Sequence, residues 1–167
     1  MIIMKKLYVC RGLPSSGKSF LAEQLYQKYY QNWAVVEIFS TDNYWLRPDG
    51  EYDWNRNFLR RAHEWNYDKF AKFVAESSLH SKNDTYVAIL DNTNIGWTEF
   101  EHYIVWALFH EYEIEIVEPS TEWRYDVNEC ASKNSHGVPL ETIQRMKDRW
   151  ESTEQCLQKL ALLKSRK

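Results

Sequence analysis

Residues 12–19 read GLPSSGKS, which matches the full pattern G-x-x-x-x-G-K-[ST] of a phosphate-binding loop. Before this loop, Lys6 to Cys10 form an apolar run that predicts a buried strand. After it, Leu21, Leu25 and Tyr29 stand at helical spacing. A strand, a loop and a helix in this order are the context in which such a loop binds phosphate, whereas a chance turn of small residues needs no such flanks.

The chemistry of this loop follows from its residue types. Small residues let successive backbone N–H groups turn inward towards an anion, and the helix that follows adds the positive end of its dipole. Lys18 supplies a charge to the β- and γ-phosphates, and Ser19 offers a hydroxyl to Mg²⁺. We therefore expect ATP and Mg²⁺ as ligands, with nucleotide-binding residues at Gly12, Leu13, Pro14, Ser15, Ser16, Gly17, Lys18, Ser19 and Phe20.

Working outward, the chain alternates strand and helix patterns. Further apolar strands are predicted at 35–39, 86–90 and 113–117, with helical patterns over 58–80, 97–110, 121–134 and 140–163. This alternation is typical of an α/β fold in which a parallel sheet of about four strands has helices on both faces. We expect one P-loop kinase-like domain over 1–167, with a lid at about 124–139 and a C-terminal helix at about 140–163.

Two carboxylates follow predicted strands, at the sheet edge where α/β proteins bind ligands. Asp91 ends the run Val87–Leu90, the place of an acid that holds Mg²⁺ beside a phosphate-binding loop. Asp42 follows the second strand, where a kinase needs a base to accept a hydroxyl proton. Each aspartate has an alternative role as a turn or helix cap, since Asp is common in such positions.

The last third of the chain supplies candidate cations for a lid over the phosphates, namely Arg124, Lys133, His136, Arg145 and Arg149. His136 precedes Gly137 in a turn, and the glycine would permit the lid to move. The alternative for each cation is a solvated helix face. His63 and Asn66 lie one helical turn apart and either face an acceptor site or belong to an ordinary helix surface. Trp45 and Trp54 either stack on nucleobases or pack.

Composition narrows the class of protein. The chain has 167 residues and a net charge of −3, which excludes a generally basic nucleic-acid coat but allows a local basic groove. The three cysteines fit no zinc pattern, so we expect free thiols in a reducing compartment. We find neither an apolar run long enough for a membrane span nor an N-terminal signal pattern, and we expect an intracellular, cytoplasmic protein.

Five short segments carry a resemblance to a known family: RGLP at 11–14, IFSTD at 38–42, AHEWN at 62–66, DNTN at 91–94 and HGV at 136–138. Over residues 6–151 the chain resembles the small Nedd-four-binding-protein-two-like P-loop proteins. These belong to the polynucleotide-kinase-like branch, akin to the kinase domain of the bacteriophage 5′-hydroxyl polynucleotide kinase. The phosphate-binding loop alone is generic, whereas its combination with DNTN is specific to this branch.

The resemblance implies a compact P-loop kinase fold with strand order 2-3-1-4, and it implies ATP and Mg²⁺. It makes Asp42 the general base, and gives Lys18 and Ser19 the phosphate and metal roles. The family usually has a pair of arginines before the lid asparagine, where this chain has Ser132-Lys133. Lysine keeps the charge but loses the bidentate geometry of arginine, which bears on catalytic efficiency more than on nucleotide binding.

Three functions compete at this point. The first is an ATP-dependent kinase of a 5′-hydroxyl on an RNA or DNA end, with Lys18, Asp42, Lys133 and His136 as its catalytic residues. The acidic balance favours short ends or single strands for that acceptor. The second is a kinase of a nucleoside or another small molecule. The third is a nucleotide-binding interaction module with weak catalysis, suggested by the Ser132-Lys133 departure.

Overall fold

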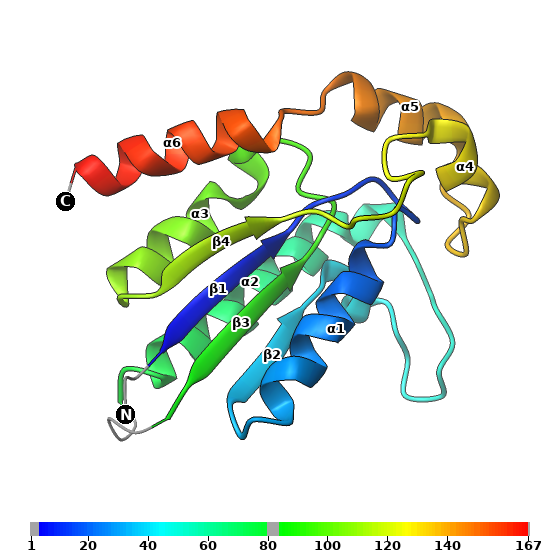
Figure 1. The fold of residues 1–167 in the computed structure, drawn as a ribbon. Helices are drawn as coiled ribbons and strands as arrows, with labels where there is room; N and C mark the ends of the chain where they lie inside the picture. The colour runs from blue at the N-terminus through cyan, green and yellow to red at the C-terminus, as the bar shows by residue number, and fades with distance from the viewer. Residues whose placement is uncertain (1–3, 80–83, 167) are drawn as a thin grey trace.

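A four-stranded parallel sheet forms the centre of the molecule (Figure 1). The computed structural model describes residues 4–79 and 84–166. The strands are β1 (Lys5–Cys10), β2 (Val35–Phe39), β3 (Tyr86–Asp91) and β4 (Glu113–Val117), and they lie in the order β2-β3-β1-β4. The predicted strands and the strand order 2-3-1-4 are confirmed.

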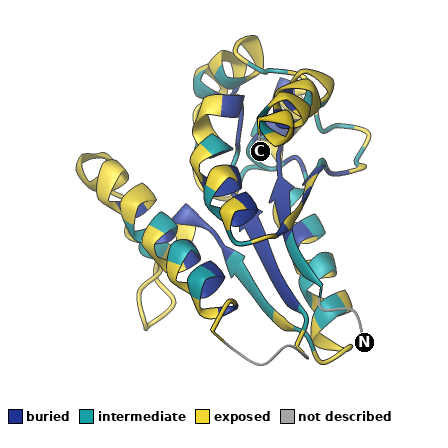
Figure 2. Ribbon diagram, turned by 90° about the vertical axis from the view of Figure 1, so that its left-hand side faces the viewer, coloured by how far each residue is buried: buried dark blue, intermediate teal, exposed yellow. Residues whose placement is uncertain are grey.

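Alternate residues of the strands pack into two hydrophobic cores, one on each face of the sheet. Tyr8, Cys10 and Ile89 pack with α1 (Lys18–Tyr30) on one face. Leu7, Val9, Leu90 and their neighbours pack on the other face with α2 (Leu59–Glu76), α3 (Trp97–Phe109) and α6 (Thr153–Ser165). Figure 2 shows the result, since the central strands are buried and the outer faces of the helices are exposed. Strands buried on both faces read as continuous apolar runs, which is the pattern seen in this sequence.

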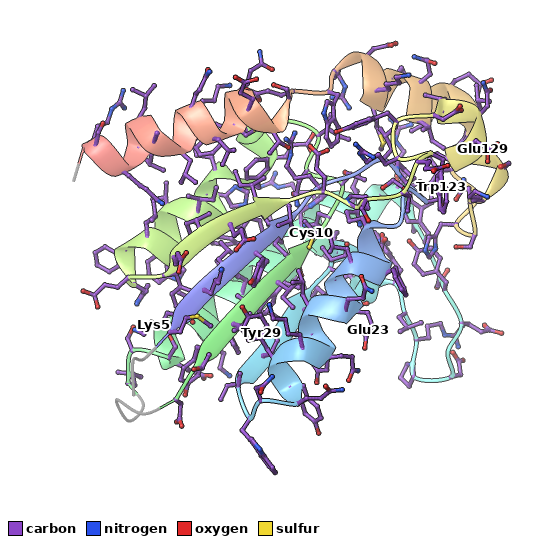
Figure 3. All side chains as sticks on the ribbon, in the orientation of Figure 1. Lys5, Cys10, Glu23, Tyr29, Trp123 and Glu129 are labelled. Carbon is purple, nitrogen blue, oxygen red and sulfur yellow. The ribbon has the colours of Figure 1, made fainter. Side chains whose placement is uncertain are left out.

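The register of the sheet brings the strand ends to one edge. Cys10 pairs with Asp91 and with Val117, so β1, β3 and β4 end at the same level. Figure 3 places Cys10 at this edge and Lys5 at the opposite end of β1. The loops that follow the four strands therefore share one rim, and this rim carries every candidate site residue that follows a strand.

A small third core lies beside that rim. Val127 and Cys130 of α4 (Val127–Ser132) and Ile143 of α5 (Leu140–Asp148) pack against Leu13 of the phosphate-binding loop and against Ile95. The segment expected to be a lid is thus attached through apolar contacts to the loop that it would cover.

The expected helices over 121–134 and 140–163 are wrong in extent. Residues 121–126 are turns, because the Asp126 side chain caps α4 by accepting from the amides of Asn128 and Glu129. The C-terminal stretch is two helices, because a capping box between Ser152 and Gln155 starts α6 anew. The predicted helix over 58–80 is α2 with a short 3₁₀ turn (Arg56–Phe58) before it, and its residue 80 lies outside the described residues.

All three cysteines, Cys10, Cys130 and Cys156, are buried free thiols, as expected. Across residues 4–79 and 84–166, none of the helices has both the length and the apolar character needed to cross a membrane.

Candidate active site

The phosphate-binding loop joins β1 to α1, which begins at Lys18. Gly17 precedes the helix with φ 98°, and Ser15 also has a positive φ of 61°. Among the described residues, the backbone N–H groups of Gly17, Lys18 and Ser19 donate to no protein acceptor. A run of free N–H groups at a helix N-terminus is an anion-binding arrangement.

Close contacts explain the glycines of this loop. A Cβ on Gly17 would lie 2.8 Å from Cγ2 of Thr121, and a Cβ on Gly12 would collide with Oγ of Ser16. The Ser16 hydroxyl is buried and has no hydrogen-bond partner in the described part of the chain. Both observations fit a loop shaped to wrap closely around a phosphate chain.

Lys18 and Asp91 form an ion pair within the site. The Lys18 Nζ lies 2.5 Å from Oδ1 of Asp91, and both side chains are about nine-tenths buried. The pair joins the predicted phosphate-binding lysine to the predicted Mg²⁺-binding acid, so both stand at the loop. Cys10 is their neighbour, and burial, with the Asp91 carboxylate second, raises the pKa of its thiol to about 12. This cysteine therefore stays protonated and is no nucleophile.

The DNTN segment locks the ends of neighbouring strands together. Asn94 donates from Nδ2 to the carbonyl of Cys10, and the Gly12 amide donates to the carbonyl of Thr93. Asn92 accepts from the Thr41 amide at 2.9 Å, so the segment after β3 also fixes the segment after β2. The two asparagines of DNTN therefore have different structural roles. Asn94 binds the end of β1, and Asn92 binds the segment after β2.

Asp42 lies in a 3₁₀ turn (Thr41–Tyr44) directly after β2 and is exposed. Its Oδ1 accepts a hydrogen bond of 3.3 Å from the Tyr52 hydroxyl. Burial, with Asp42 second, raises the pKa of Tyr52 to about 12, so this hydroxyl keeps its proton. Thr41, next to Asp42, is bonded from its hydroxyl to Nδ1 of His63 at 3.3 Å. Asp42 therefore stands at the rim, in contact with a hydroxyl group.

Two of the five predicted lid cations, Lys133 and His136, contact different residues of the rim. Lys133 sits over the ring of Trp123, 4.8 Å from its centroid, and Trp123 donates from Nε1 to the carbonyl of Ser15. His136 contacts the ring of Tyr52, with centroids 5.0 Å apart. Lys133 is thus one side chain away from the phosphate-binding loop, and His136 is one side chain away from Asp42.

For two residues of the acceptor region, the structure selects packing from the alternatives that the sequence left open. Asn66 is buried between α2 and α3, where it donates to the Tyr103 hydroxyl, so it faces no acceptor. Trp45 is 4% exposed and packs, whereas Trp54 is 53% exposed. His63, the companion of Asn66, does reach the rim through Thr41. Burial lowers its pKa, against an opposing effect of Glu99 and Asp42.

Sequence reasoning missed three residues. Arg11 is fully buried and donates to the carbonyls of Asn94, Ile95 and Glu151 and to the Thr153 hydroxyl, which ties the α5–α6 junction to the loop. An arginine at the end of a buried strand was the available signal. Tyr52 and Trp123 also take part in the rim, but neither carries a sequence signal, since their roles depend on contacts between distant segments.

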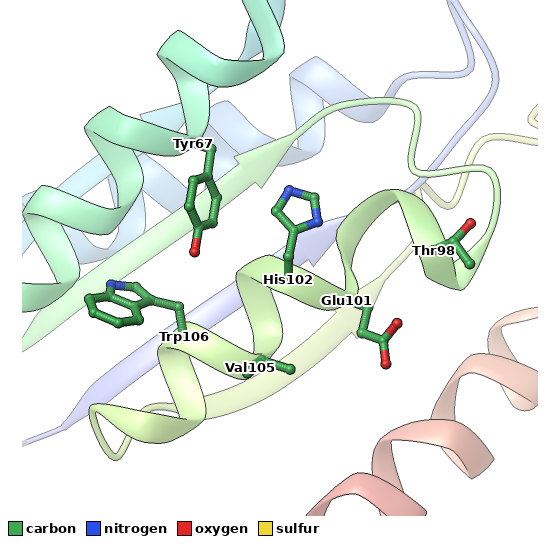
Figure 4. Close-up of a pocket in the computed structure, with 6 residues that line it drawn as sticks. All are labelled: Tyr67, Thr98, Glu101, His102, Val105 and Trp106. Atoms are coloured by element: carbon green, nitrogen blue, oxygen red, sulfur yellow. The ribbon is translucent and has the colours of Figure 1, made fainter. Parts of the chain in front are cut away.

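A hollow of about 360 Å³ lies elsewhere, on the surface of α2 and α3 (Figure 4). It is lined by Tyr67, Thr98, Glu101, His102, Val105 and Trp106. None of these residues belongs to the phosphate-binding loop or follows a strand, so the hollow is separate from the candidate active site.

The metal-binding capacity of the site is limited. The described residues hold no group of three or more His, Cys, Asp or Glu side chains placed to bind a metal ion. A site built from Asp91 and the Ser19 hydroxyl fits Mg²⁺ that takes its remaining ligands from phosphate and water, because Mg²⁺ is usually bound in this way.

A family model described as AAA domain matches residues 7–153. The chain belongs to this AAA domain family. The chain is also 37% identical over 145 residues to human NEDD4-binding protein 2, covering 87% of this chain and 8% of that protein. It is 28% identical over 143 residues to rat 2′,3′-cyclic-nucleotide 3′-phosphodiesterase, covering 86% of this chain and 30% of that protein. The chain thus spans under a third of either relative.

Solved structures of related fold have TM-scores of 0.53 with this AAA domain chain. One is in the Pnkp1/Rnl/Hen1 complex, at 20% identity, covering 83% of this chain and 42% of that one. Another is Chaetomium thermophilum Kti12 in complex with ADP-AlF3, at 18% identity, covering 87% of this chain and 80% of that one. The domain therefore has a P-loop kinase-like fold.

Proposed function

We propose that this protein is an ATP-dependent kinase that transfers the γ-phosphoryl group to a 5′-hydroxyl at a nucleic-acid end. The observation that carries the proposal is the pairing of an exposed Asp42, hydrogen-bonded to a hydroxyl, with a phosphate-binding loop on the same rim. The names of two compared proteins support it, since one contains Pnkp1 and the other acts on 2′,3′-cyclic nucleotides.

Each residue has a stated task in this proposal. The free N–H groups of Gly17, Lys18 and Ser19 would hold the phosphate chain. Asp91 and Ser19 would hold Mg²⁺, and the Lys18 ammonium would leave Asp91 for the phosphates. When bound, MgATP supplies the phosphoryl group that is transferred.

Asp42 would accept the proton of the attacking hydroxyl. The Tyr52 hydroxyl now donates to Asp42, so an acceptor hydroxyl would take its place on the same carboxylate oxygen. Lys133 and His136, which contact the rim through Trp123 and Tyr52, would interact with the transferred group.

The test is transfer of labelled phosphate from ATP to a 5′-hydroxyl oligoribonucleotide by the wild type, Lys18→Ala and Asp42→Asn. We expect Asp42→Asn to lower the rate by about 10²–10⁴-fold, the range for loss of a general base, with ATP affinity unchanged. We expect Lys18→Ala to weaken both ATP binding and transfer. A matched control is Asp49→Asn, an exposed aspartate that pairs with Arg47.

Transfer by the wild type that survives in Asp42→Asn would contradict the role of Asp42. ATP binding without transfer to RNA or DNA would contradict the nucleic-acid acceptor. A panel of small hydroxyl compounds, scored by ADP release, would then separate a small-molecule kinase from a nucleotide-binding interaction module.

A further inference from the structure

The segment between β2 and α2 exposes aromatic rings beside Asp42. Trp54, Phe58 and Tyr52 are 53%, 40% and 36% exposed. In Figure 1 this segment leaves the body of the molecule as a long loop, and its residues 46–60 are exposed. Exposing large aromatic rings to water is energetically unfavourable. Several exposed rings beside a candidate active site therefore indicate a binding surface.

Trp54 is held in place from one side. Its ring lies 6.4 Å from that of the buried Trp45, and Trp45 packs at 4.9 Å on Tyr44. The Asp53 amide donates to the Trp45 carbonyl at 3.0 Å. Trp54 is therefore a supported ring with an exposed side, and a flat ligand could stack there without first ordering the side chain.

Tyr52 links this ring to the reacting end of the site. Its ring contacts His136 of the lid, and its hydroxyl donates to Asp42. Trp54 lies two residues beyond it in the chain. A ligand whose terminal hydroxyl reaches Asp42 would therefore pass Tyr52 first and extend its remaining length towards Trp54.

Some arginines beside the exposed rings form ion pairs, and others do not. Arg47 pairs with Asp49 and Glu51, and Arg60 pairs with Glu64. By contrast, Arg56 and Arg61 have no ion pair among the described residues, and Arg61 lies over the Phe58 ring at 5.7 Å. The two arginines available to a ligand thus flank the exposed rings, although the chain as a whole carries a charge of −3.

We propose that Trp54, Phe58, Arg56 and Arg61 form a binding surface for single-stranded nucleic acid that leads away from Asp42. Exposed rings and free cations in alternation match the base faces and phosphates of a single strand, whereas a duplex hides its base faces. The proposal deepens the proposed function by naming the substrate class, and on that point it rests on that function. The nucleic acid would lie with its 5′ end at Asp42 and its next bases against Trp54.

The test measures binding before any transfer. A labelled 5′-hydroxyl oligonucleotide of about ten nucleotides, within the range that one single-strand-binding domain covers, is titrated with protein and followed by fluorescence anisotropy. We expect Trp54→Ala to weaken binding by about 5- to 150-fold, as expected for the loss of one stacked base. The control is Trp33→Ala, which removes a ring that is 96% exposed but follows α1 at the other end of β2.

The arginines are tested through salt dependence. We expect the double variant Arg56→Ala with Arg61→Ala to lower the slope of log K against log salt by about 1.4, since each contact with a single-strand phosphate contributes about 0.7. Arg47→Ala is the matched control, because Arg47 is an exposed arginine of the same segment that two acids already neutralise. We expect it to leave the slope unchanged.

Two results would overturn the surface. One is equal binding by the wild type and Trp54→Ala, and the other is equal affinity for a blunt duplex and a single strand. A wild type that binds no oligonucleotide overturns it too. Failure of the proposed function looks different: binding that depends on Trp54 without any phosphoryl transfer overturns the kinase and keeps the surface. Phosphoryl transfer by Trp54→Ala with an unchanged KM for the oligonucleotide overturns the surface and keeps the kinase.

Discussion

The two sides of the rim are built in different ways. On the phosphate side, Arg11 is fully buried, and its guanidinium donates to three carbonyls and a hydroxyl while stacking 4.4 Å from the Trp150 ring. On the acceptor side, residues 46–60 are exposed, and Asp42 is reached by one hydroxyl. The phosphate-binding loop is thus held by buried hydrogen bonds, whereas the segment around Asp42 is mostly exposed to solvent.

The physical basis of the contrast is the dielectric surroundings of each group. A buried cation that donates four hydrogen bonds holds several loops in one arrangement, because a buried polar group without a partner loses its solvation. Exposed side chains are solvated in any arrangement, so they contribute little to stability and remain available to a ligand. Substitutions on the two sides should therefore differ in their effect on stability.

Replacing Arg11 should have the largest effect on folding. Arg11→Met would leave the carbonyls of Asn94, Ile95 and Glu151 without their donor, together with an unpaired Glu118 carboxylate 4.0 Å from the guanidinium. We expect a loss of about 3–5 kcal/mol in the free energy of unfolding, the range for breaking a buried charge pair. Urea unfolding followed by circular dichroism measures it.

The matched change on the other side is Arg47→Met. Arg47 makes two ion pairs, but its side chain is 52% exposed. We expect a loss of no more than about 1 kcal/mol, because exposed ion pairs contribute little. Equal losses in the two variants would show that the contrast between the sides is wrong.

The glycines give a second matched pair. Gly17 and Gly50 both have a positive φ, of 98° and 85°, but a Cβ on Gly50 meets nothing within 4 Å. Each change to alanine should cost about 1–2 kcal/mol for the left-handed backbone. Gly17→Ala should cost about 1 kcal/mol more for overpacking against Thr121, and it should also weaken ATP binding. Calorimetric ATP titration and unfolding curves measure both; identical behaviour of the two variants would contradict a close-fitting loop.

Histidine titration should produce a smaller effect. Burial lowers the pKa of His63, His102 and His110 in the folded state. As the pH falls through about 6.5, the unfolded chain takes up protons first, so stability falls on acidification. His63→Gln should reduce this fall between about pH 7.5 and 5.5 and leave the slope above pH 8 unchanged, since histidine is neutral there in both states. An unaltered acid-side slope would exclude a folded-state effect at His63.

Removing the Tyr52 hydroxyl should have the smallest effect on folding. Tyr52→Phe deletes the bond to an exposed Asp42, and we expect the free energy of unfolding to change by no more than about 0.5 kcal/mol. The contact with His136 uses the ring and should persist. A loss of several kcal/mol would mean that the acceptor side, like the phosphate side, is part of the fixed framework.

Sequence patterns predicted the sheet and its rim well. Apolar runs located β1, β2 and β3, and the alternation of glutamate with isoleucine located β4. The loop at 12–19 located the start of α1 and Lys18, the lysine that forms an ion pair with Asp91. Single residues were harder: Asn66 and Trp45 pack inside the molecule, and periodicity does not tell which neighbour covers a polar or aromatic side chain.

Helix ends in the C-terminal third were predicted less well. The pattern over 140–163 reads as one helix, but Arg11 draws the Glu151 carbonyl into its own hydrogen-bond set and Trp150 stacks on the guanidinium. The Ser152 cap then starts a new helix. A residue 140 positions away in the chain therefore helps to decide where α5 and α6 separate.

Local spacing and residue type were enough to predict the class of fold, the phosphate-binding loop and the two aspartates that follow strands. Three features depend on the folded chain: Tyr52 reaches Asp42, Trp123 links Lys133 to the loop, and Arg11 is buried. These contacts join segments far apart in the chain, so they form only when packing brings the segments together.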